Sequence, residues 1–240
     1  MPLLTDLTPD AWRKGQLLLV DKPLEWTSFQ VVNKIRWALK KRFGFKNIKV
    51  GHAGTLDPLA TGLLLICVGK WTKKIETFQG MNKEYTGVIS LGATTPSYDL
   101  ETPIDKHYPT DHIDADGLES ARCQFLGELQ QYPPIFSAIK KEGVRLYEHA
   151  RQGKTVAISP RTIHIHDFSI NTDQFPEIGF CVNCSKGTYI RSLAHDYGQA
   201  LNSGGHLSVL RRTKIGPYTV EDAYTLSTLI ETLHPTSAGS

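Results

Sequence analysis

Residues 51–62 read Gly-His-Ala-Gly-Thr-Leu-Asp-Pro-Leu-Ala-Thr-Gly, and the apolar run 63–68 follows at once. A short apolar run bounded by glycines predicts a buried strand. Asp57 is the carboxylate of the stretch, and Pro58 after it pushes its backbone out of the helical region and removes a neighbouring N–H. The stretch therefore predicts a stiff loop that presents Asp57 to a ligand. The alternative is a plain Asp-Pro turn that leads into a core strand.

The composition is that of an ordinary globular protein, with 240 residues, 40% hydrophobic and 21% charged residues, and a net charge of +3. This length permits one large domain or two small ones. Two groups of basic residues stand out: Lys34, Arg36, Lys40, Lys41, Arg42, Lys46 and Lys49, without an acid among them, and Lys186, Arg191, Arg211, Arg212 and Lys214. Solvated helix faces would explain such groups, but their position on either side of the Asp57 loop favours a surface that follows phosphates.

Several classes of protein are disfavoured by the sequence. Charged residues interrupt the N-terminal segment, so no signal peptide is predicted, and no apolar run is long enough to cross a membrane. The cysteines are expected to be reduced, which indicates a cytoplasmic protein. Cys181-x-x-Cys184 could suggest a zinc or redox site. It reads as part of a strand, however, where residues three apart point to opposite faces, so the two thiols are not expected to act together. His164 and His166 share one face of another predicted strand, but without a third ligand we predict no metal site.

Strands and helices alternate without a strict βαβ rhythm, which predicts the α+β class with a mixed, mostly antiparallel central sheet flanked by helices. We expect strands at 17–20, 63–68, 83–92, 161–170, 178–184 and 206–213, and helices at 28–42, 72–78, 190–201 and 226–233. A further helix is marked by Leu118, Ala121, Phe125 and Leu126 and is ended by Pro133-Pro134. Residues 94–110 read as an irregular loop, 137–143 as a hairpin and 146–152 as a short helix. The first long helix should bury Phe29, Val32, Ile35 and Leu39.

The pattern Gly-His-x-Gly-x-Leu-Asp-Pro-x-Ala-x-Gly-x-Leu that begins at Gly51 resembles the catalytic motif of the TruB family of tRNA pseudouridine synthases. Other segments resemble the family in the expected order, over about residues 16–225: Asp21-Lys22-Pro23, Trp26-Thr27-Ser28, Lys83-x-Tyr85, Pro133-Pro134-x-x-Ser137-Ala138-x-Lys140, Leu146-Tyr147-x-x-Ala150-Arg151, Ser-Lys-Gly-Thr-Tyr-Ile-Arg at 185–191, and Leu207-x-x-Leu210-Arg211-Arg212. The resemblance implies the pseudouridine synthase fold and the isomerisation of uridine-55 in the T stem-loop of tRNA.

The same resemblance suggests how the chain is divided. We expect an N-terminal lead-in at 1–15, a catalytic domain at 16–225, and a short C-terminal helix and tail at 226–240. Many family members continue into an RNA-binding PUA domain, and the residues after position 220 are too few for one. RNA binding is therefore expected mainly from the catalytic domain.

The chemistry requires an ionised carboxylate in a dry pocket, which receives a uracil flipped out of its RNA loop. Burial alone would raise the pKa of Asp57, and a neighbouring guanidinium would oppose this. Arg191 is the candidate, because a cation at a helix start is disfavoured by the helix dipole unless an anion compensates it. A bidentate Arg191–Asp57 pair would hold both charge and geometry, and the resemblance implies the same pairing.

Tyr85 is the third candidate catalytic residue, because its ring can stack on a flipped base. The alternative is an ordinary core tyrosine; the resemblance implies stacking and proton acceptance from the ribose. The residues expected to bind substrate are His52, Lys22, Lys83, Leu210 and Gly54. The resemblance assigns His52 to the space vacated by the base and Leu210 to the pocket wall, which would otherwise be a plain core leucine.

Five basic residues are expected to contact RNA phosphates: Lys40, Lys41, Arg42, Lys186 and Arg211. The isomerisation is redox-neutral, so neither a cofactor nor a metal is predicted. The expected partner is tRNA, bound by a monomer without an obligate protein partner. Whether the carboxylate attacks the base or the ribose stays open.

Three alternatives remain at this stage. A guide-RNA-dependent synthase of the H/ACA type shares the Asp57 motif but would need a PUA domain and protein partners. A non-catalytic tRNA chaperone could use the same surface without needing a carboxylate beside the RNA. A metal hydrolase would use His164 and His166 and would be sensitive to chelators.

Overall fold

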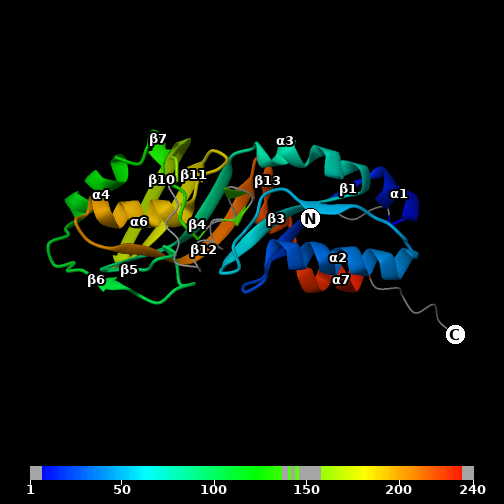
Figure 1. Ribbon diagram of the computed structural model, residues 1–240, viewed down its shortest axis with the longest axis horizontal. Coiled ribbons are helices and arrows are strands. Elements are labelled where there is room, and N and C mark those ends of the chain that lie inside the picture. The colour runs from blue at the N-terminus through cyan, green and yellow to red at the C-terminus, as the bar shows by residue number, and fades with distance from the viewer. Residues whose placement is uncertain (1–6, 137–139, 142–143, 146–157, 234–240) are drawn as a thin grey trace. The chain divides into compact units, whose positions relative to one another are not determined.

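The computed structural model describes residues 7–136, 140–141, 144–145 and 158–233. The chain forms two compact units (Figure 1). The first contains Met1–Tyr85 and Arg211–Ser240, and the second contains Thr86–Leu210. Two strands, β4 (Lys83–Leu91) and β12 (Gly205–Ile215), contribute residues to both units.

The first unit is a sheet covered by helices. Its strands follow the order β14-β1-β3-β12-β4, with β2 paired to β3 and β13 to β12. Strand β1 runs parallel to β14 and antiparallel to β3. In chain order, the elements of this unit besides β4 and β12 are α1 (Pro9–Lys14), β1 (Gln16–Lys22), α2 (Ser28–Phe43), β2 (Val50–His52), β3 (Ala60–Val68), the 3-10 helix η1 (Gly69–Lys74), α3 (Ile75–Gln79), β13 (Tyr218–Thr219), η2 (Val220–Asp222), β14 (Tyr224–Thr225) and α7 (Leu226–Leu233).

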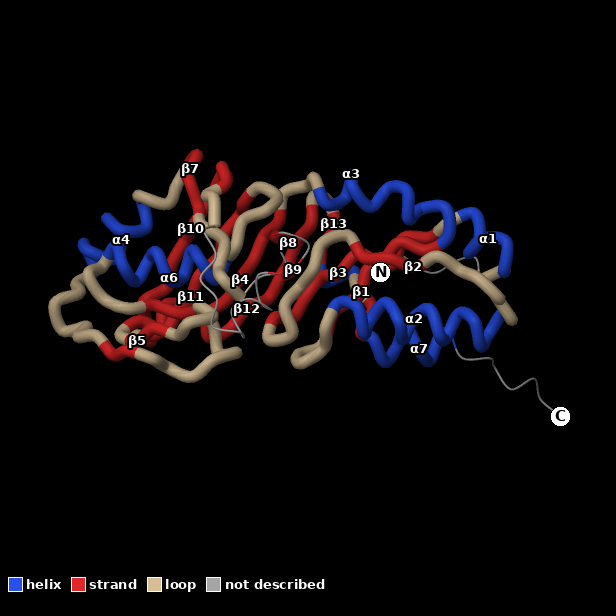
Figure 2. The backbone as a smooth tube through the Cα atoms, in the orientation of Figure 1, coloured by secondary structure: helices blue, strands red, loops and turns tan. Residues whose placement is uncertain are grey.

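Strand β3 is buried on both faces, which explains its continuous apolar sequence. Leu64, Ile66 and Val68 point into the cluster under α2 and α7. Their alternating neighbours Leu63 and Leu65 point into a second cluster beside η1 and α3. Figure 2 shows the strands of this unit between α3 on one side and α2 with α7 on the other. The prediction of a buried strand after the Asp57 loop is confirmed.

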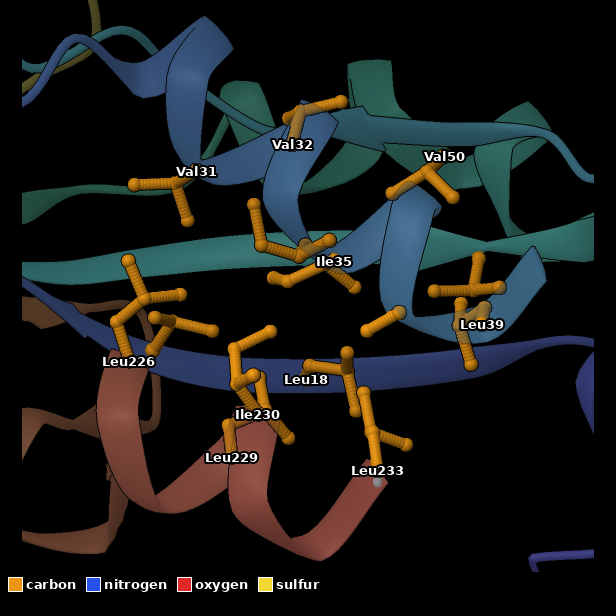
Figure 3. Packing of buried hydrophobic residues seen from close by; sticks show 14 of the residues in the cluster. Leu18, Val31, Val32, Ile35, Leu39, Val50, Leu226, Leu229, Ile230 and Leu233 are labelled. Atoms are coloured by element: carbon orange, nitrogen blue, oxygen red, sulfur yellow. The ribbon is translucent and has the colours of Figure 1, made fainter. Parts of the chain in front are cut away.

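Helix α2 begins and ends as its sequence predicts. Thr27 caps the N-terminus in a reciprocal arrangement with Gln30, and Gly44 ends the helix in the left-handed conformation at φ 65°. Figure 3 shows the apolar side chains of α2 and α7 pointing toward one another around Leu18. The predicted burial of Phe29 is wrong, because its side chain is 61% exposed.

The buried stripe of α2 in fact follows Val31, Ile35 and Ala38, together with Val32 and Leu39. These positions recur at the three- and four-residue intervals of one helix face. Phe29 lies two residues before Val31, which places it about 200° away around the helix axis.

The second unit has its own sheet order, β12-β4-β11-β10-β7. Both β11 and β7 pair antiparallel to β10. In chain order, the elements of this unit besides β4 and β12 are β5 (Ala93–Thr94), β6 (Lys106–His107), α4 (Ala115–Cys123), β7 (Gly127–Gln131), β8 (Lys140–Lys141), β9 (Val144–Arg145), β10 (Arg161–Gln174), β11 (Glu177–Cys184) and α6 (Ile190–Ala200).

The structure differs from the sequence-based expectation at several elements. Residues 9–14 form α1 rather than a loose lead-in, because Trp12 is fully buried in the core. The helix expected to run from Leu118 up to Pro133 ends at Cys123, and strand β7 begins at Gly127, whose φ of 87° does not fit a helix. The β8–β9 pair, Lys140–Lys141 with Val144–Arg145, overlaps only part of the hairpin expected at 137–143. Residues 137–139 and 142–143 and the helix expected at 146–152 lie outside the described residues.

The predicted α+β class with a mixed sheet flanked by helices is confirmed. The expected helices at 28–42, 190–201 and 226–233 are found within a residue of these ends. Among the described helices, none has the length and apolar character needed to cross a lipid bilayer.

Candidate functional site

The loop that carries Asp57 connects two paired strands. Strand β2 pairs antiparallel with the end of β3, and this pairing extends to Ala53, whose N–H donates to the Leu65 carbonyl oxygen at 2.9 Å. The chain then turns back at 54–59, with the Ala60 N–H donating to the Asp57 carbonyl at 3.1 Å. Asp57 is half-buried, while its neighbour Leu56 is buried. The loop therefore has fixed ends and an accessible carboxylate.

Ser28 fixes this loop from the first turn of α2. Its hydroxyl donates to the Leu56 carbonyl at 3.0 Å and accepts from the Leu56 N–H at 2.9 Å. Ser28 is 2% exposed, so both hydrogen bonds lie away from water. A single hydroxyl thus satisfies both backbone polar groups of the residue that precedes Asp57, which would otherwise be buried without partners.

Arg212 fixes the other side of the loop. Its Nη2 donates to the Gly54 carbonyl at 3.1 Å and its Nε to the Leu63 carbonyl at 2.8 Å. The β12 backbone passes so close to Gly62 that a Cβ atom there would lie 2.3 Å from the Arg212 carbonyl oxygen. Gly62 also has a φ of 104°, which favours glycine. The last glycine of the loop is therefore required by the approach of β12.

Lys22 supplies a buried positive charge next to Asp57. Its Nζ donates to the carbonyls of Trp26 at 2.6 Å, Pro23 at 2.9 Å and Pro58 at 3.3 Å, and its side chain is fully buried. Burial lowers the pKa of Lys22 to about 8, and the Asp57 carboxylate opposes this shift. The ammonium group therefore both holds the Asp57 loop and places a positive charge next to its carboxylate.

His52 stands at the end of β2, where the loop begins. Burial lowers its pKa below the ordinary value, and the positive charge of Arg212 acts in the same direction. The imidazole is therefore neutral at pH 7. A neutral, half-buried ring is suited to contact a base or a sugar rather than a phosphate.

Tyr85 and Lys83 begin strand β4 and belong to the same unit as Asp57. The Tyr85 side chain is 9% exposed. The Lys83 ammonium donates to the carbonyls of Gln79 at 2.6 Å and Met81 at 2.5 Å, so it holds the turn between α3 and β4. Between them, Glu84 accepts from Thr213 and Lys214 of β12. The start of β4 is thereby tied to the strand that carries Arg212.

Arg191 belongs to the second unit, where it is the second residue of α6 and is 5% exposed. Its Nε lies 3.6 Å from the Asp99 carboxylate, and its Nη1 donates to the carbonyls of Phe136 at 2.9 Å and Ser97 at 3.3 Å. The anion expected beside this arginine was Asp57, and within the second unit its carboxylate neighbour is Asp99. The pairing of Arg191 with Asp57 stays a prediction.

The chain around Arg191 is held by further buried polar side chains. Gln131 donates to the Tyr189 carbonyl at 3.0 Å and accepts from its N–H at 2.8 Å, which fixes the start of α6. Asp99 also accepts from the Glu101 N–H at 3.0 Å. The guanidinium thus has a fixed place within the second unit.

The five candidate phosphate contacts have different surroundings. Arg211 forms a two-pronged ion pair with Asp21, with N···O distances of 2.7 and 3.0 Å. Arg42 donates to the Thr232 carbonyl at 2.6 Å. Lys40, Lys41 and Lys186 are exposed. The role of all five in binding RNA stays a prediction. Leu210 is half-buried and is the last residue of the second unit, and its contact with the substrate also stays a prediction.

The residues considered for a metal site are surface side chains. His164 and His166 are exposed and stack with ring centroids 4.4 Å apart. Within the described ranges, no three His, Cys, Asp or Glu side chains group so as to hold a metal ion. Cys184 is buried and Cys181 half-buried on β11, as expected for opposite strand faces.

Sequence reasoning missed the residues that hold the candidates in place. Ser28 and Arg212 lie in segments that resemble the family, but nothing in their local pattern indicates a contact with residues 54–63. Asp99 lies in a segment read as an irregular loop. A buried arginine needs partners. The burial of Arg191 would therefore indicate a nearby acid, but the sequence alone does not show that this side chain is buried.

Comparison with known proteins finds relatives over nearly the whole chain. Residues 40–190 match the model of the TruB family pseudouridylate synthase N-terminal domain, and residues 191–238 match the tRNA pseudouridylate synthase B C-terminal domain. Proteins named tRNA pseudouridine synthase B are similar: that of Flavobacterium johnsoniae is 60% identical over 95% of this chain and 100% of its own length. That of Phocaeicola vulgatus is 51% identical over 92% and 94%.

Solved structures agree on the fold. A crystal structure of a Cbf5-Nop10-Gar1 complex contains a chain with a TM-score of 0.69 and 29% identity over 92% of this chain. This chain spans 54% of the length of that one. The sequence matches cover nearly the whole chain and include the Asp57 loop, and the chain therefore belongs to the TruB family of pseudouridylate synthases.

Proposed function

We propose that this protein isomerises uridine to pseudouridine in tRNA, at uridine-55 of the T stem-loop, with Asp57 as the catalytic carboxylate. The observation that carries the proposal is the rigid presentation of Asp57: Ser28 and Arg212 fix the backbone on both sides of it, and the Lys22 ammonium lies beside it. A buried support of this kind is what a catalytic group requires for a fixed geometry.

The reaction explains the need for such a carboxylate. The bond between N1 of uracil and C1′ of ribose breaks, a bond between C5 and C1′ forms, the C5 hydrogen leaves as a proton, and N1 gains one. Asp57 acts either by attack on the base or the ribose or by stabilising positive charge on the ribose. Each role requires the ionised form; the Lys22 ammonium lies beside this carboxylate, and Arg191 is its second proposed partner.

Tyr85 and His52 complete the proposed site. Tyr85 would stack on the flipped uracil, and the neutral imidazole of His52 would occupy the place that the base leaves. Lys83 acts through the turn that it holds before Tyr85. Gly54 allows close approach of the substrate, and Leu210 lines the pocket.

We further infer that residues 16–225 act as one catalytic domain, that the protein works as a monomer without an obligate protein partner, and that it acts in the cytoplasm on tRNA. Lys40, Lys41, Arg42, Lys186 and Arg211 are proposed to contact phosphates. The relatives that carry the name tRNA pseudouridine synthase B are 51–60% identical, against 29% for the Cbf5 complex, which favours a stand-alone tRNA enzyme over a guide-RNA-dependent one.

The test is to incubate the purified protein alone with an unmodified tRNA transcript and to map pseudouridine along the RNA. We expect modification at position 55 without any guide RNA or added protein. Modification that appears only with a guide RNA would support the H/ACA type instead. Tight tRNA binding without any modification would support the chaperone. A hydrolytic activity that a chelator abolishes would support the metal hydrolase.

A further inference from the structure

The outward face of α2 carries two large aromatic side chains that the core does not use. Phe29 is 61% exposed and Trp37 is 50% exposed. They are eight residues apart, so they lie on the same side of the helix and about 12 Å apart along its axis. Exposed aromatic rings at regular helical spacing indicate a contact surface rather than packing.

The same face is positively charged. Helix α2 contains five basic residues and no acid. Arg36 and Arg42 donate to the carbonyls of Val50 and Thr232, which ties them to neighbouring elements. The exposed ammonium groups of Lys34 and Lys41 lie 5.5 and 5.0 Å from the centre of the Trp37 ring.

The helix dipole explains only part of this charge. Cations in the last turn are stabilised by it, which accounts for the residues near Phe43. Lys34 lies in the middle of the helix, where the dipole has no such effect. We name the residues Phe29, Lys34, Trp37, Lys40 and Lys41 the α2 stripe.

The composition of the α2 stripe selects one kind of partner. Proteins that bind single-stranded nucleic acid combine aromatic rings, on which bases stack, with cations that follow the phosphates. Two separate rings do not form the contiguous apolar patch that is typical of a protein interface. The stripe therefore fits unpaired RNA nucleotides.

The position of the stripe relative to Asp57 supports the same partner. Ser28, one residue before Phe29, holds Leu56 and thereby the Asp57 loop. Lys34 also borders a cavity of about 660 Å³ whose wall includes Lys22, Glu231 and the ion-paired Asp21 and Arg211. RNA bound at Asp57 would thus meet the beginning of α2 and a basic surface that continues along it.

We propose that the α2 stripe binds unpaired nucleotides of the substrate RNA that adjoin the target uridine, with bases stacked on Phe29 and Trp37 and phosphates held by the lysines. This inference rests on the proposed function in that the substrate is RNA. It adds a binding surface that extends away from the catalytic loop along the helix.

The test measures RNA binding, which needs no turnover. Trp37→Ala should bind a tRNA transcript and an isolated T stem-loop about five- to hundredfold more weakly, as expected for one lost stacking contact. Binding of a blunt RNA duplex should change far less. Trp37→Phe keeps a ring and should retain most of the affinity, but it should lose the quenching of tryptophan fluorescence that RNA causes in the unaltered protein.

Trp71→Phe is the matched control, because Lys74 lies 4.2 Å from the Trp71 ring while that ring stacks on Phe78. It should leave both affinity and quenching unchanged. If Trp37→Ala melts normally and binds loop RNA within twofold of the unaltered protein, the proposal is wrong. It is equally wrong if Trp37→Ala changes the sedimentation of the RNA-free protein, since the stripe would then join copies of the chain. Failure to form pseudouridine would refute the proposed function separately.

Discussion

Replacing Arg212 with methionine should destabilise the first unit by about 3 kcal/mol. The side chain is 1% exposed and donates hydrogen bonds to the carbonyls of Leu63 and Gly54. A hydrogen bond to a charged group contributes roughly 1.5–3 kcal/mol, so the two together contribute about 3–6 kcal/mol. Removing a buried charge offsets part of this loss, which places the expected value near the lower end.

The neighbouring Arg211 provides a matched control. Its side chain is 38% exposed and pairs with Asp21, which is 27% exposed. Ion pairs of this kind contribute about 0–1 kcal/mol. Arg211→Met should therefore change the free energy of unfolding by at most about 1 kcal/mol, although it removes the same charge from the same strand.

Urea unfolding of the RNA-free protein, followed by tryptophan fluorescence, measures both values. We expect the midpoint for Arg212→Met to lie well below that of Arg211→Met. Arg212→Lys, which keeps the charge but loses the second donor, should fall between them and should also slow pseudouridine formation, because the Gly54 carbonyl loses its partner. Equal midpoints for the Arg211 and Arg212 variants would refute the assignment of Arg212 as the support of the loop.

Other consequences follow from the same contacts. Ser28→Ala should lower stability by about 2 kcal/mol or more, because the buried N–H and carbonyl of Leu56 lose their partner, and should reduce the rate of modification at saturating tRNA; an unchanged rate would contradict a positioning role. Gly62→Ala should destabilise the protein far more than Gly44→Ala, since both have positive φ but only Gly62 faces backbone at 2.3 Å; similar melting temperatures would contradict this. Because the pKa of Lys22 is lowered from 10.5 to about 8, the folded protein binds fewer protons than the unfolded chain between these values, so the stability of the unaltered protein relative to Lys22→Met should rise as the pH is raised through this window; a constant difference in urea midpoint would argue against the buried ammonium.

Local patterns were enough to predict much of the fold. The cap at Thr27 and the stop at Gly44 defined α2, and the apolar run at 63–68 defined β3, because these signals depend on neighbours in sequence. The face of α2 was harder. The predicted burial of Val32, Ile35 and Leu39 is confirmed, but Phe29, which fits an apolar spacing of three with Val32, is exposed. The packing against α7 shows that Val31 and Ala38 complete the buried stripe in its place.

In the candidate site, too, the features encoded by neighbouring residues could be predicted, and the contacts between distant residues could not. Asp57 could be recognised because its glycines and proline lie within one short stretch. The contacts from Ser28 and Arg212 join residues that are 28 and 158 positions from their partners Leu56 and Gly54, and no local pattern encodes such pairs. Strand β7 was missed because the helix was expected to continue to Pro133, whereas Gly127 with its positive φ begins the strand soon after α4 ends.

The most direct test compares Asp57→Asn with the unaltered protein on tRNA whose uridines carry tritium at C5. Asparagine keeps the size and the loop but cannot carry the charge. We predict that tritium release and pseudouridine at position 55 are abolished, while the affinity for tRNA stays within a few-fold of the original. Continued release of tritium from position 55 by Asp57→Asn would contradict the assignment of this carboxylate as the catalytic group.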